Sequence, residues 1–341
     1  MSSNNTLPTV AQTPEVADPC AALLEGYYDS HLHIAAIFII MATSFIGTLL
    51  PILGKKLIQS KASFATYSGR TFIVTLKLFG AGVILATALV HMFIPATQAL
   101  TNPCLPQTFT GYPAFSAVFA IGGIFLTHLI QVFAGHAIKS RQKEASMSLD
   151  KTAITAAGQV TTPSSDLTHH EGHTHGGALM HAQEMQLMVY LLELGIASHS
   201  IIIGITLGIV TDEFKTLLIA LCFHQFFEGL ALSAIVIEAD FKKMTMAVCM
   251  VIFYTLTTPI GIVIGVSIRE FYNANGTQTL ISTGALDAIS SGILLYDALV
   301  NVIFPHFSAE SFNSLSPIRK ILQLVTMYLG CAIMSFIGVW A

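Results

Sequence analysis

The ionisable residues best suited to chemistry lie in two neighbouring apolar segments. The first segment reads LELGIASHSIIIGITLG and includes His199, and the second reads FHQFFEGLAL and includes His224 and Glu228. His224 and Glu228 are four residues apart, so on a helix they project from the same face. Imidazole nitrogens and carboxylate oxygens are ligands for divalent metal ions such as zinc. Two histidines and one glutamate on adjacent helices therefore predict a site for one divalent cation.

A purely structural interpretation competes with the metal site. A buried histidine often serves only as a hydrogen-bonded core residue, and a His–Glu pair four residues apart can form a buried ion pair. Ionisable groups inside an apolar membrane segment are costly, however, and they usually face the interior of a bundle or a pathway. Three such groups at similar depth therefore favour the metal site.

The composition indicates that lipid is the solvent for much of the chain. Hydrophobic residues make up 53% of the sequence and charged residues only 10%, whereas about 25% of the residues in a soluble domain are charged. The net charge of −4 provides no basic surface for phosphate groups. We therefore expect a lipid bilayer as a partner and no nucleic acid.

Eight apolar segments are long enough to cross that bilayer, because a spanning helix needs about 20 mainly apolar residues. None of them alternates as a membrane strand does, so the expected fold is an all-α integral membrane bundle of eight transmembrane helices. The expected spans cover residues 33–54, 71–95, 114–138, 185–210, 214–238, 243–268, 281–306 and 319–340.

Lysine and arginine residues are distributed unevenly between the two sides of the expected bundle. Twelve of them lie in the loops after the first, third, fifth and seventh spans, and two lie on the opposite side. The excess marks the cytoplasmic side, so both termini are expected to be extracytoplasmic. The expected parts are an N-terminal tail (1–32), three spans (33–138), a cytoplasmic His-rich loop (139–184), and five spans that include the metal site (185–341).

Three cysteines (Cys222, Cys249 and Cys331) lie in apolar segments, and two lie outside them. The five cysteines include no CxxC pair, so a thiolate zinc knuckle is excluded. Cys20 and Cys104 lie outside the apolar segments on the expected extracytoplasmic side, where a disulfide can form. The sequence leaves open whether they form a bridge or remain two free thiols.

The long loop contains a second candidate metal site. Its segment Thr152–Gly177 is rich in Thr, Ser, Ala, Gly and His and is expected to be largely disordered. Neutral imidazoles in a flexible chain can gather around zinc, copper or nickel. Such loose binding suits sensing or buffering of a metal better than its transport. The alternative interpretation is a polar linker that is merely rich in histidine. The histidines concerned are His169, His170, His173 and His175, followed by His181.

Four ionisable residues in other spans are further candidates for the path of an ion. His91 falls near the outer end of the second span, His128 within the third, Asp287 near the outer face of the seventh, and Asp297 further along the seventh. Together they can line a route for an ion through the bundle. Each of them can equally be a packed polar residue, and both interpretations remain open.

Several of these segments resemble the ZIP family of zinc and iron transporters, especially its plant and fungal branch. LELGIASHSIIIGITLG and FHQFFEGLAL resemble the fourth and fifth spans of the family, GAGVILATALVHMFIPA the second, and SSGILLYDALVN the seventh. The resemblance covers essentially all eight spans. It implies transport of Zn²⁺, or in some members Fe²⁺, Mn²⁺, Cd²⁺ or Cu²⁺, into the cytoplasm, with no resident cofactor. It also places His199, His224 and Glu228 on the family's ligand positions.

The sequence departs from members of the family that bind two ions. Ile203 stands where those members have a bridging glutamate, and Thr258, before Pro259, stands where they have a glutamate for the second ion. The resemblance therefore implies one ion here, completed by water, Ser200 or Gln225. Because a proton competes with the ion for each ligand, uptake is expected to fall at low pH.

Two other classes of membrane protein are weighed against a transporter. A zinc hydrolase needs an open coordination position and a general base, and the sequence contains no HExxH motif, so an enzyme is not expected. A metal sensor would bind without moving the ion, and net flux distinguishes it from a carrier. The resemblance also implies a homodimer, and an outward N-terminus suits the plasma membrane or a vacuole-type organelle.

Overall fold

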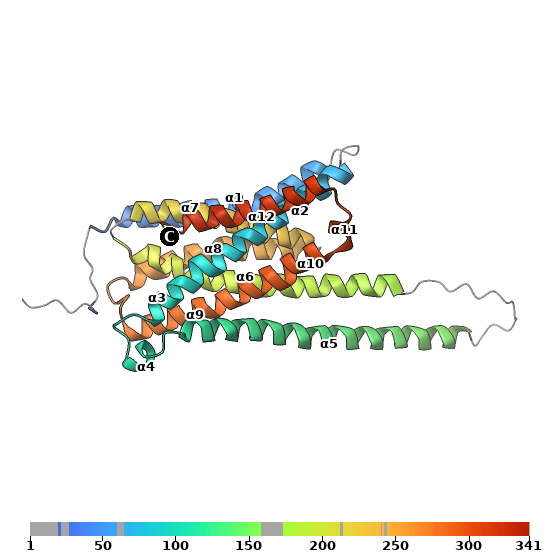
Figure 1. Ribbon diagram of the computed structural model, residues 1–341, viewed down its shortest axis with the longest axis horizontal. Coiled ribbons are helices and arrows are strands. Elements are labelled where there is room, and N and C mark those ends of the chain that lie inside the picture. The colour runs from blue at the N-terminus through green and yellow to red at the C-terminus, as the bar shows by residue number, and fades with distance from the viewer. Residues whose placement is uncertain are drawn as a thin grey trace, which may run out of the picture.

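The structure is a computed structural model of the chain, and it shows an elongated bundle of helices (Figure 1). It describes residues 20–21, 27–59, 65–157, 173–211, 214–239, 241 and 244–340. Within these ranges eight helices are long and apolar enough to cross a membrane, as the sequence predicted. The all-α fold follows from the solvent, because lipid offers no hydrogen bonds and a helix satisfies its backbone internally.

The spans observed in the described residues match the expected ones closely but differ at their ends. They are Ser30–Lys56, Thr71–Leu100, Phe115–Ser140, Met185–Ile209, Phe214–Glu238, Thr245–Ile268, Thr277–Ser308 and Pro317–Ile337. The second span continues to Leu100 rather than ending at residue 95, and the seventh begins at Thr277 rather than at residue 281. Both extensions are at the end of the bundle where α12 ends (Figure 1), and they change the depth of the residues inside.

Two of the spans are interrupted by short π-helical segments. The second span consists of α2 (Ala65–Ala86), η1 (Thr87–Phe93) and α3 (Ile94–Leu100), and the seventh consists of α9 (Thr277–Tyr296), η2 (Asp297–Ile303) and α10 (Phe304–Ser308). The other elements are α1 (Ser30–Gln59), α4 (Gln107–Thr110), α5 (Phe115–Ala157), α6 (His173–Ile209), α7 (Phe214–Glu238), α8 (Met244–Ile268), α11 (Glu310–Asn313) and α12 (Pro317–Ile337).

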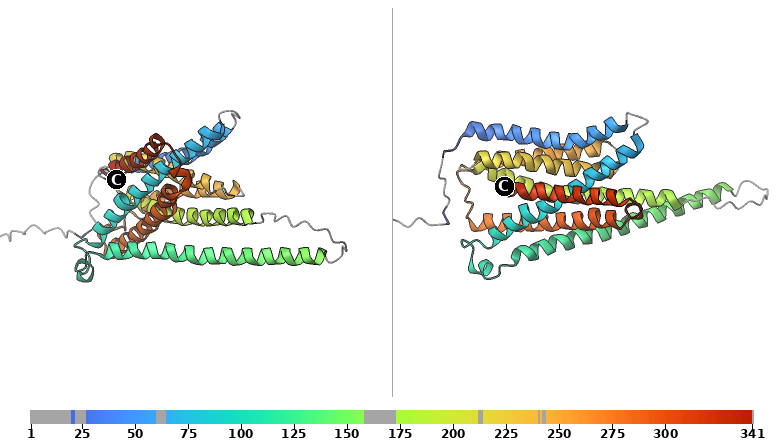
Figure 2. Two further views of the ribbon diagram at one scale, coloured as in Figure 1. Left: turned by 45° about the vertical axis from the view of Figure 1, so that its right-hand side comes forward. Right: turned by 45° about the horizontal axis from the view of Figure 1, so that its top comes forward.

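The expected disorder between residues 152 and 177 is wrong at both ends of that segment. Helix α5 continues to Ala157, and helix α6 already begins at His173. Both helices extend beyond the rest of the bundle at one end (Figures 1 and 2). Good helix formers such as Lys, Arg, Gln, Glu and Ala are frequent in residues 138–157, and no Gly or Pro interrupts them. The high helix propensity of residues 138–157 therefore extends α5 beyond its membrane-spanning segment.

Helices α6 and α8 pack closely through small residues. A Cβ added at Gly204 would lie 2.4 Å from the Thr258 carbonyl oxygen, and one added at Gly208 would lie 2.6 Å from the Ile262 carbonyl oxygen. The facing residues are again glycines, Gly261 and Gly265. Two GxxxG motifs thus let the backbones approach, which is how membrane helices gain packing energy. This contact holds the helix that carries His199.

We expect Gly208→Val to separate α6 from α8 and destabilise the folded protein. The added side chain has no space, and overpacking of a tight contact costs about 1–3 kcal/mol or more. The thermal midpoint and monodisperse yield of the purified protein in detergent measure the effect. Gly122→Val is the matched control, because a Cβ at this helical glycine meets nothing within 4 Å. Equal stability of the two variants would contradict the close packing.

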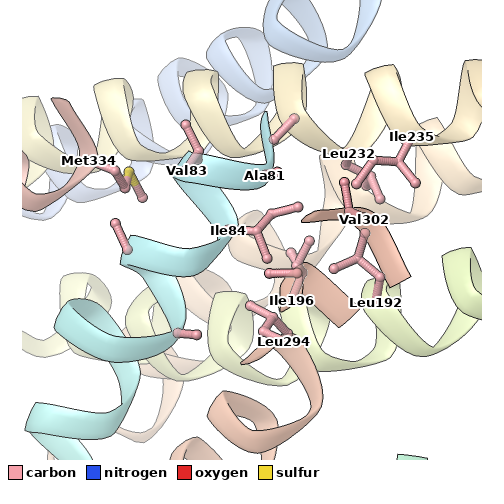
Figure 3. Packing of buried hydrophobic residues seen from close by; sticks show 14 of the residues in the cluster. Ala81, Val83, Ile84, Leu192, Ile196, Leu232, Ile235, Leu294, Val302 and Met334 are labelled. Carbon is pink, nitrogen blue, oxygen red and sulfur yellow. The ribbon is translucent and has the colours of Figure 1, made fainter. Parts of the chain in front are cut away.

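A buried apolar cluster at the centre of the bundle joins the helices around the candidate site. Figure 3 shows Ala81, Val83 and Ile84 of α2 surrounded by side chains from α6, α7, α9, η2 and α12. All the labelled residues are buried. The packing orients α2, and with it the π-helical segment η1 that follows.

Cys20 and Cys104 form a disulfide, which decides the alternative that the sequence left open. Their Cα atoms are 5.6 Å apart and 84 residues separate them in the chain. The Asn273 side chain donates a hydrogen bond of 3.1 Å to the Cys20 carbonyl. The bridge ties the N-terminal segment to the loop between α3 and α4, at the end of the bundle where α12 ends (Figure 1).

Candidate metal centre

Four ionisable residues from four elements lie at one depth in the bundle. His199 is ten residues before the end of α6, His224 and Asp287 are ten residues after the starts of α7 and α9, and His91 is nine residues before the end of α3. All four helix ends are at the same end of the bundle. Ten residues of helix rise about 15 Å, which is half of the roughly 30 Å hydrocarbon core. The four residues therefore lie near the middle of the membrane.

The helical spacing of α7 brings His224 and Glu228 together, as the sequence predicted. His224 Nε2 lies 3.6 Å from Glu228 Oε2, and the two side chains are 1% and 0% exposed. This separation is longer than a hydrogen bond. The two groups thus approach each other without satisfying each other.

His199 of α6 faces this pair, and a carboxylate on α9 orients it. The ring centroids of His199 and His224 are 5.6 Å apart. His199 Nδ1 lies 3.3 Å from Asp287 Oδ1, so Nδ1–H donates and Nε2 keeps its lone pair. Metal-binding histidines commonly donate their second nitrogen to a carboxylate in this way. Asp287 is therefore part of the centre and does not lie near the outer face, where the sequence placed it.

His91 also lies deeper than the sequence indicated. Its ring contacts that of His224 at a centroid distance of 4.9 Å. Its Nε2 donates a hydrogen bond of 2.8 Å to the Met334 carbonyl, which leaves Nδ1 as the acceptor nitrogen of a neutral ring. The expected second span was five residues too short at its outer end, so His91 seemed to be near the surface.

The π-helical geometry around His91 has a local cause. Pro95 follows η1 at the start of α3, and Pro305 follows η2 at the start of α10. A proline cannot donate the helical hydrogen bond to the carbonyl four residues earlier, so the preceding turn widens. Single π turns inside helices are frequent at functional sites. Here they carry His91 and Asp297.

Gln225 and Ser200, the two residues predicted to complete the coordination, differ in their surroundings. The Gln225 amide nitrogen donates to the Thr258 hydroxyl and, at 3.4 Å, to Ser44. Its oxygen has no hydrogen-bond partner, and neither does the Ser200 hydroxyl. Both residues are fully buried. Gln225 thus links α7 to α1 and α8, and both its oxygen and the Ser200 hydroxyl remain available.

The centre contains an unusual number of buried polar atoms without a hydrogen-bond partner. These atoms are His199 Nε2, both ring nitrogens of His224 and both carboxylate oxygens of Glu228. Buried polar groups are normally paired, because an unpaired one costs about 1–3 kcal/mol. Nitrogen and carboxylate oxygen are the donor types that zinc and similar ions take. The residues present therefore fit a divalent cation.

As they stand, these side chains are close but not yet arranged around one point. Within the part of the chain that the structure describes, no three His, Cys, Asp or Glu side chains already form a group that holds a metal ion. The donor atoms of His199, His224 and Glu228 would have to turn toward a common point to share an ion. A centre of this kind can gather its ligands when an ion arrives and release them when it leaves.

The remaining predicted residues lie elsewhere. His128 Nδ1 and the Tyr296 hydroxyl are 3.0 Å apart at an exposed position of the α5–α9 contact. Asp297 is buried in η2. In the loop, His169 and His170 lie outside the described residues; His173 and His175 lie on the first turn of α6, and their side chains are also outside the description.

The two positions that would serve a second ion have other partners. Ile203 packs against the apolar cluster around Leu207 and Ile262. Thr258 is buried and accepts a hydrogen bond from Gln225. Neither residue offers an anionic ligand for a second ion.

An eight-span helical bundle with a buried cluster of histidines and carboxylates halfway through the membrane has the architecture of an ion carrier. Comparison with known families gives the same class: the ZIP zinc transporter profile matches residues 30–338. The match covers most of the chain, so the chain belongs to the ZIP family of membrane metal transporters, which are transporters and not enzymes.

Relatives in fungi and plants are similar along nearly the whole of this chain. Zinc-regulated transporter 1 of Candida albicans is 34% identical over 92% of this chain, which spans 62% of that protein's length. Zinc transporter 5 of Oryza sativa is 33% identical over 91% of this chain and 87% of its own length. A chloroplastic Fe(2+) transport protein 3 of Arabidopsis thaliana is 31% identical over 99% of this chain and 91% of its own length.

Proposed function

We propose that this protein carries a divalent cation, zinc in the first place, into the cytoplasm through a site between α6 and α7. The observation that carries the proposal is the set of unpartnered donor atoms on His199, His224 and Glu228. They are buried near the middle of the membrane, where an unpaired polar group is costly. A cation that passes through would pair them, which gives their presence a reason.

The three ligands have different roles in this proposal. Glu228 supplies the negative charge, and the imidazoles of His199 and His224 supply neutral nitrogen ligands. Asp287 holds His199 so that Nε2 faces His224, and His91 borders the pair from η1. With Ser200, Gln225 or water as exchangeable ligands, the site binds moderately and releases its ion, whereas a closed four-ligand structural site would retain it.

The direction of transport rests on which end of the bundle faces out. The Cys20–Cys104 disulfide belongs in an oxidising compartment, and the excess of lysine and arginine is at the opposite end. Both features support an extracytoplasmic location for the start of α1 and the end of α12. We further propose the plasma membrane as the location and a homodimer as the assembled form.

Zinc is preferred over iron and manganese on the chemistry of the donors. Two imidazoles and one carboxylate form a ligand set typical of zinc, although iron and manganese accept the same atoms. The similar proteins include both zinc transporters and Fe(2+) transport proteins by name. Competition between zinc, iron and manganese for uptake measures the order in which the site prefers them.

Flux of ⁶⁵Zn²⁺ into proteoliposomes that contain the full chain tests the proposal. We expect saturable uptake that excess unlabelled Zn²⁺ suppresses at lower concentration than Fe²⁺ or Mn²⁺. Replacement of His169, His170, His173 and His175 by serine is expected to leave the flux in place, because we assign the loop to sensing or buffering. Binding of zinc without net flux would instead identify a metal sensor.

A further inference from the structure

A second buried carboxylate lies further along the seventh span than the candidate metal centre and has no assigned role. Asp297 is 2% exposed, and it lies ten residues beyond Asp287 along the seventh span, about 15 Å further into the bundle. Its Oδ1 accepts a hydrogen bond of 2.6 Å from Asn301, and its Oδ2 has no hydrogen-bond partner. Half of this buried carboxylate is therefore unsatisfied.

The unsatisfied carboxylate lines a small cavity between α2, α6, α7 and η2. The cavity has a volume of about 20 Å³, which leaves room for little more than one water molecule. Apolar side chains form most of its wall, and four of them (Ile84, Leu192, Ile235 and Val302) converge in Figure 3. Water therefore has little space to solvate Asp297 from this side.

An ion pair between α2 and α7 forms another part of the cavity wall. Lys77 Nζ lies 2.8 Å from Glu238 Oε1, and the two side chains are 13% and 34% exposed. Both residues line the cavity together with Asp297 and Asn301. The lining thus contains one ammonium group and two carboxyl groups, so with both carboxyl groups ionised its net charge is −1, which favours a cation.

We propose that this cavity is a second cation site, on the cytoplasmic side of the first, in which Asp297 and Glu238 are the anionic ligands and Lys77 competes with the ion for Glu238. Asp297 Oδ2 and the Asn301 side-chain oxygen supply the first contacts. The cavity as it stands is too small for a hydrated ion, so an ion enters when the Lys77 ammonium leaves Glu238. The Lys77–Glu238 ion pair therefore closes the site until the entering cation displaces Lys77 from Glu238, and we call this ion pair the lock. This inference rests on the proposed transport function.

Equilibrium binding of ¹⁰⁹Cd²⁺ to the purified full chain tests the site. The loop histidines 169, 170, 173, 175 and 181 are replaced by serine in this chain, so that only ions bound within the helix bundle are counted. We expect two bound ions, one of which is lost in Asp297→Asn. Glu310→Gln is the control, since Glu310 is an exposed acid of α11, and it should keep both. An unchanged stoichiometry in Asp297→Asn would overturn the second site.

The lock predicts opposite effects for its two partners. Lys77→Gln removes the competing cation and should tighten the second ion about tenfold, whereas Glu238→Gln removes a ligand and should weaken it by a similar factor. If Asp297→Asn does not fold, these two variants decide whether the cavity binds a second cation. Equal affinities in both variants would overturn the lock.

A third variant separates this inference from the proposed function. Glu228→Gln should remove the other ion and leave the second one bound. Loss of one ion in Glu228→Gln, with none lost in Asp297→Asn, would leave the central site standing alone. The reverse result would leave the second site standing and contradict the central one. A single ion sensitive to both substitutions would mean one shared site, and the second site would be wrong.

Discussion

Glu228→Gln is expected to lower kcat/KM for zinc uptake by at least about 100-fold. The carboxylate is the only charged group among the three proposed ligands, it is 0% exposed, and neither of its oxygens has a hydrogen-bond partner. Glutamine keeps the shape of the side chain but replaces an anionic ligand by a neutral amide. A charge interaction in a buried site is worth several kcal/mol, and each 1.4 kcal/mol is a factor of ten.

The loss of uptake should be larger for Glu228→Gln than for either histidine variant, because the neutral imidazoles cannot replace the negative charge of the carboxylate. His199→Ala and His224→Ala are expected to reduce uptake too, but each leaves the carboxylate and one imidazole in place. Initial rates of ⁶⁵Zn²⁺ uptake, normalised to the amount of folded protein in the membrane, give kcat and KM for each variant.

His128→Gln is the matched control for these substitutions. His128 is a histidine within a membrane span, but it is exposed and contacts Tyr296 rather than the centre. Uptake by this variant should stay close to that of the unmodified protein. If Glu228→Gln transported zinc as well as His128→Gln does, the site between α6 and α7 would be refuted.

Asp287→Asn is expected to raise the KM for zinc by about 10–100-fold, the usual cost of losing a carboxylate that orients a metal-binding histidine. Asp287 accepts from His199 Nδ1 at 3.3 Å and thereby directs Nε2 toward His224. Asparagine can turn its amide nitrogen toward the ring, and the imidazole then loses its fixed tautomer. The ion should still cross once bound, so kcat changes less than KM.

A double-mutant cycle distinguishes orientation of His199 from a general effect on folding. If Asp287 acts through His199, then His199→Ala combined with Asp287→Asn should transport no worse than His199→Ala alone. Glu270→Gln is the control, because Glu270 is an exposed acid just beyond the end of α8, and its KM should not change. Additive losses in the double variant would show that Asp287 acts independently of His199.

The membrane class and the eight spans were predictable because the bilayer imposes them. Lipid forces every spanning segment to be a helix of about 20 apolar residues, so the hydropathy of the chain was sufficient. The α5 and α6 extensions were missed because residues 138–157 and 173–184 leave the apolar pattern. Their helicity depends on propensity, which is a weaker signal than hydrophobicity.

The pair His224 and Glu228 was predictable for a similar reason, since four residues make one turn of a helix whatever surrounds it. The positions of His91 and Asp287 were not. Each was placed near a surface because the ends of its span were misjudged by four or five residues, and η1 adds a wider turn beside His91. For His91 the signal in the sequence was Pro95, which marks an irregular turn without giving its depth. No proline lies within ten residues of Asp287.

By itself the sequence determined that this protein is an eight-helix membrane bundle with a histidine–glutamate pair on one helix face, because hydrophobicity and helical periodicity are local properties. Only the tertiary structure decided that His91 and Asp287 join His199 at that pair. His199 is paired with Asp287, and the ring of His91 meets that of His224 edge-on, because η1, α6, α7 and α9 pack at one depth. Cys20 is joined to Cys104 across 84 residues. Contacts between distant segments depend on how whole helices pack, and no short stretch of sequence contains that information.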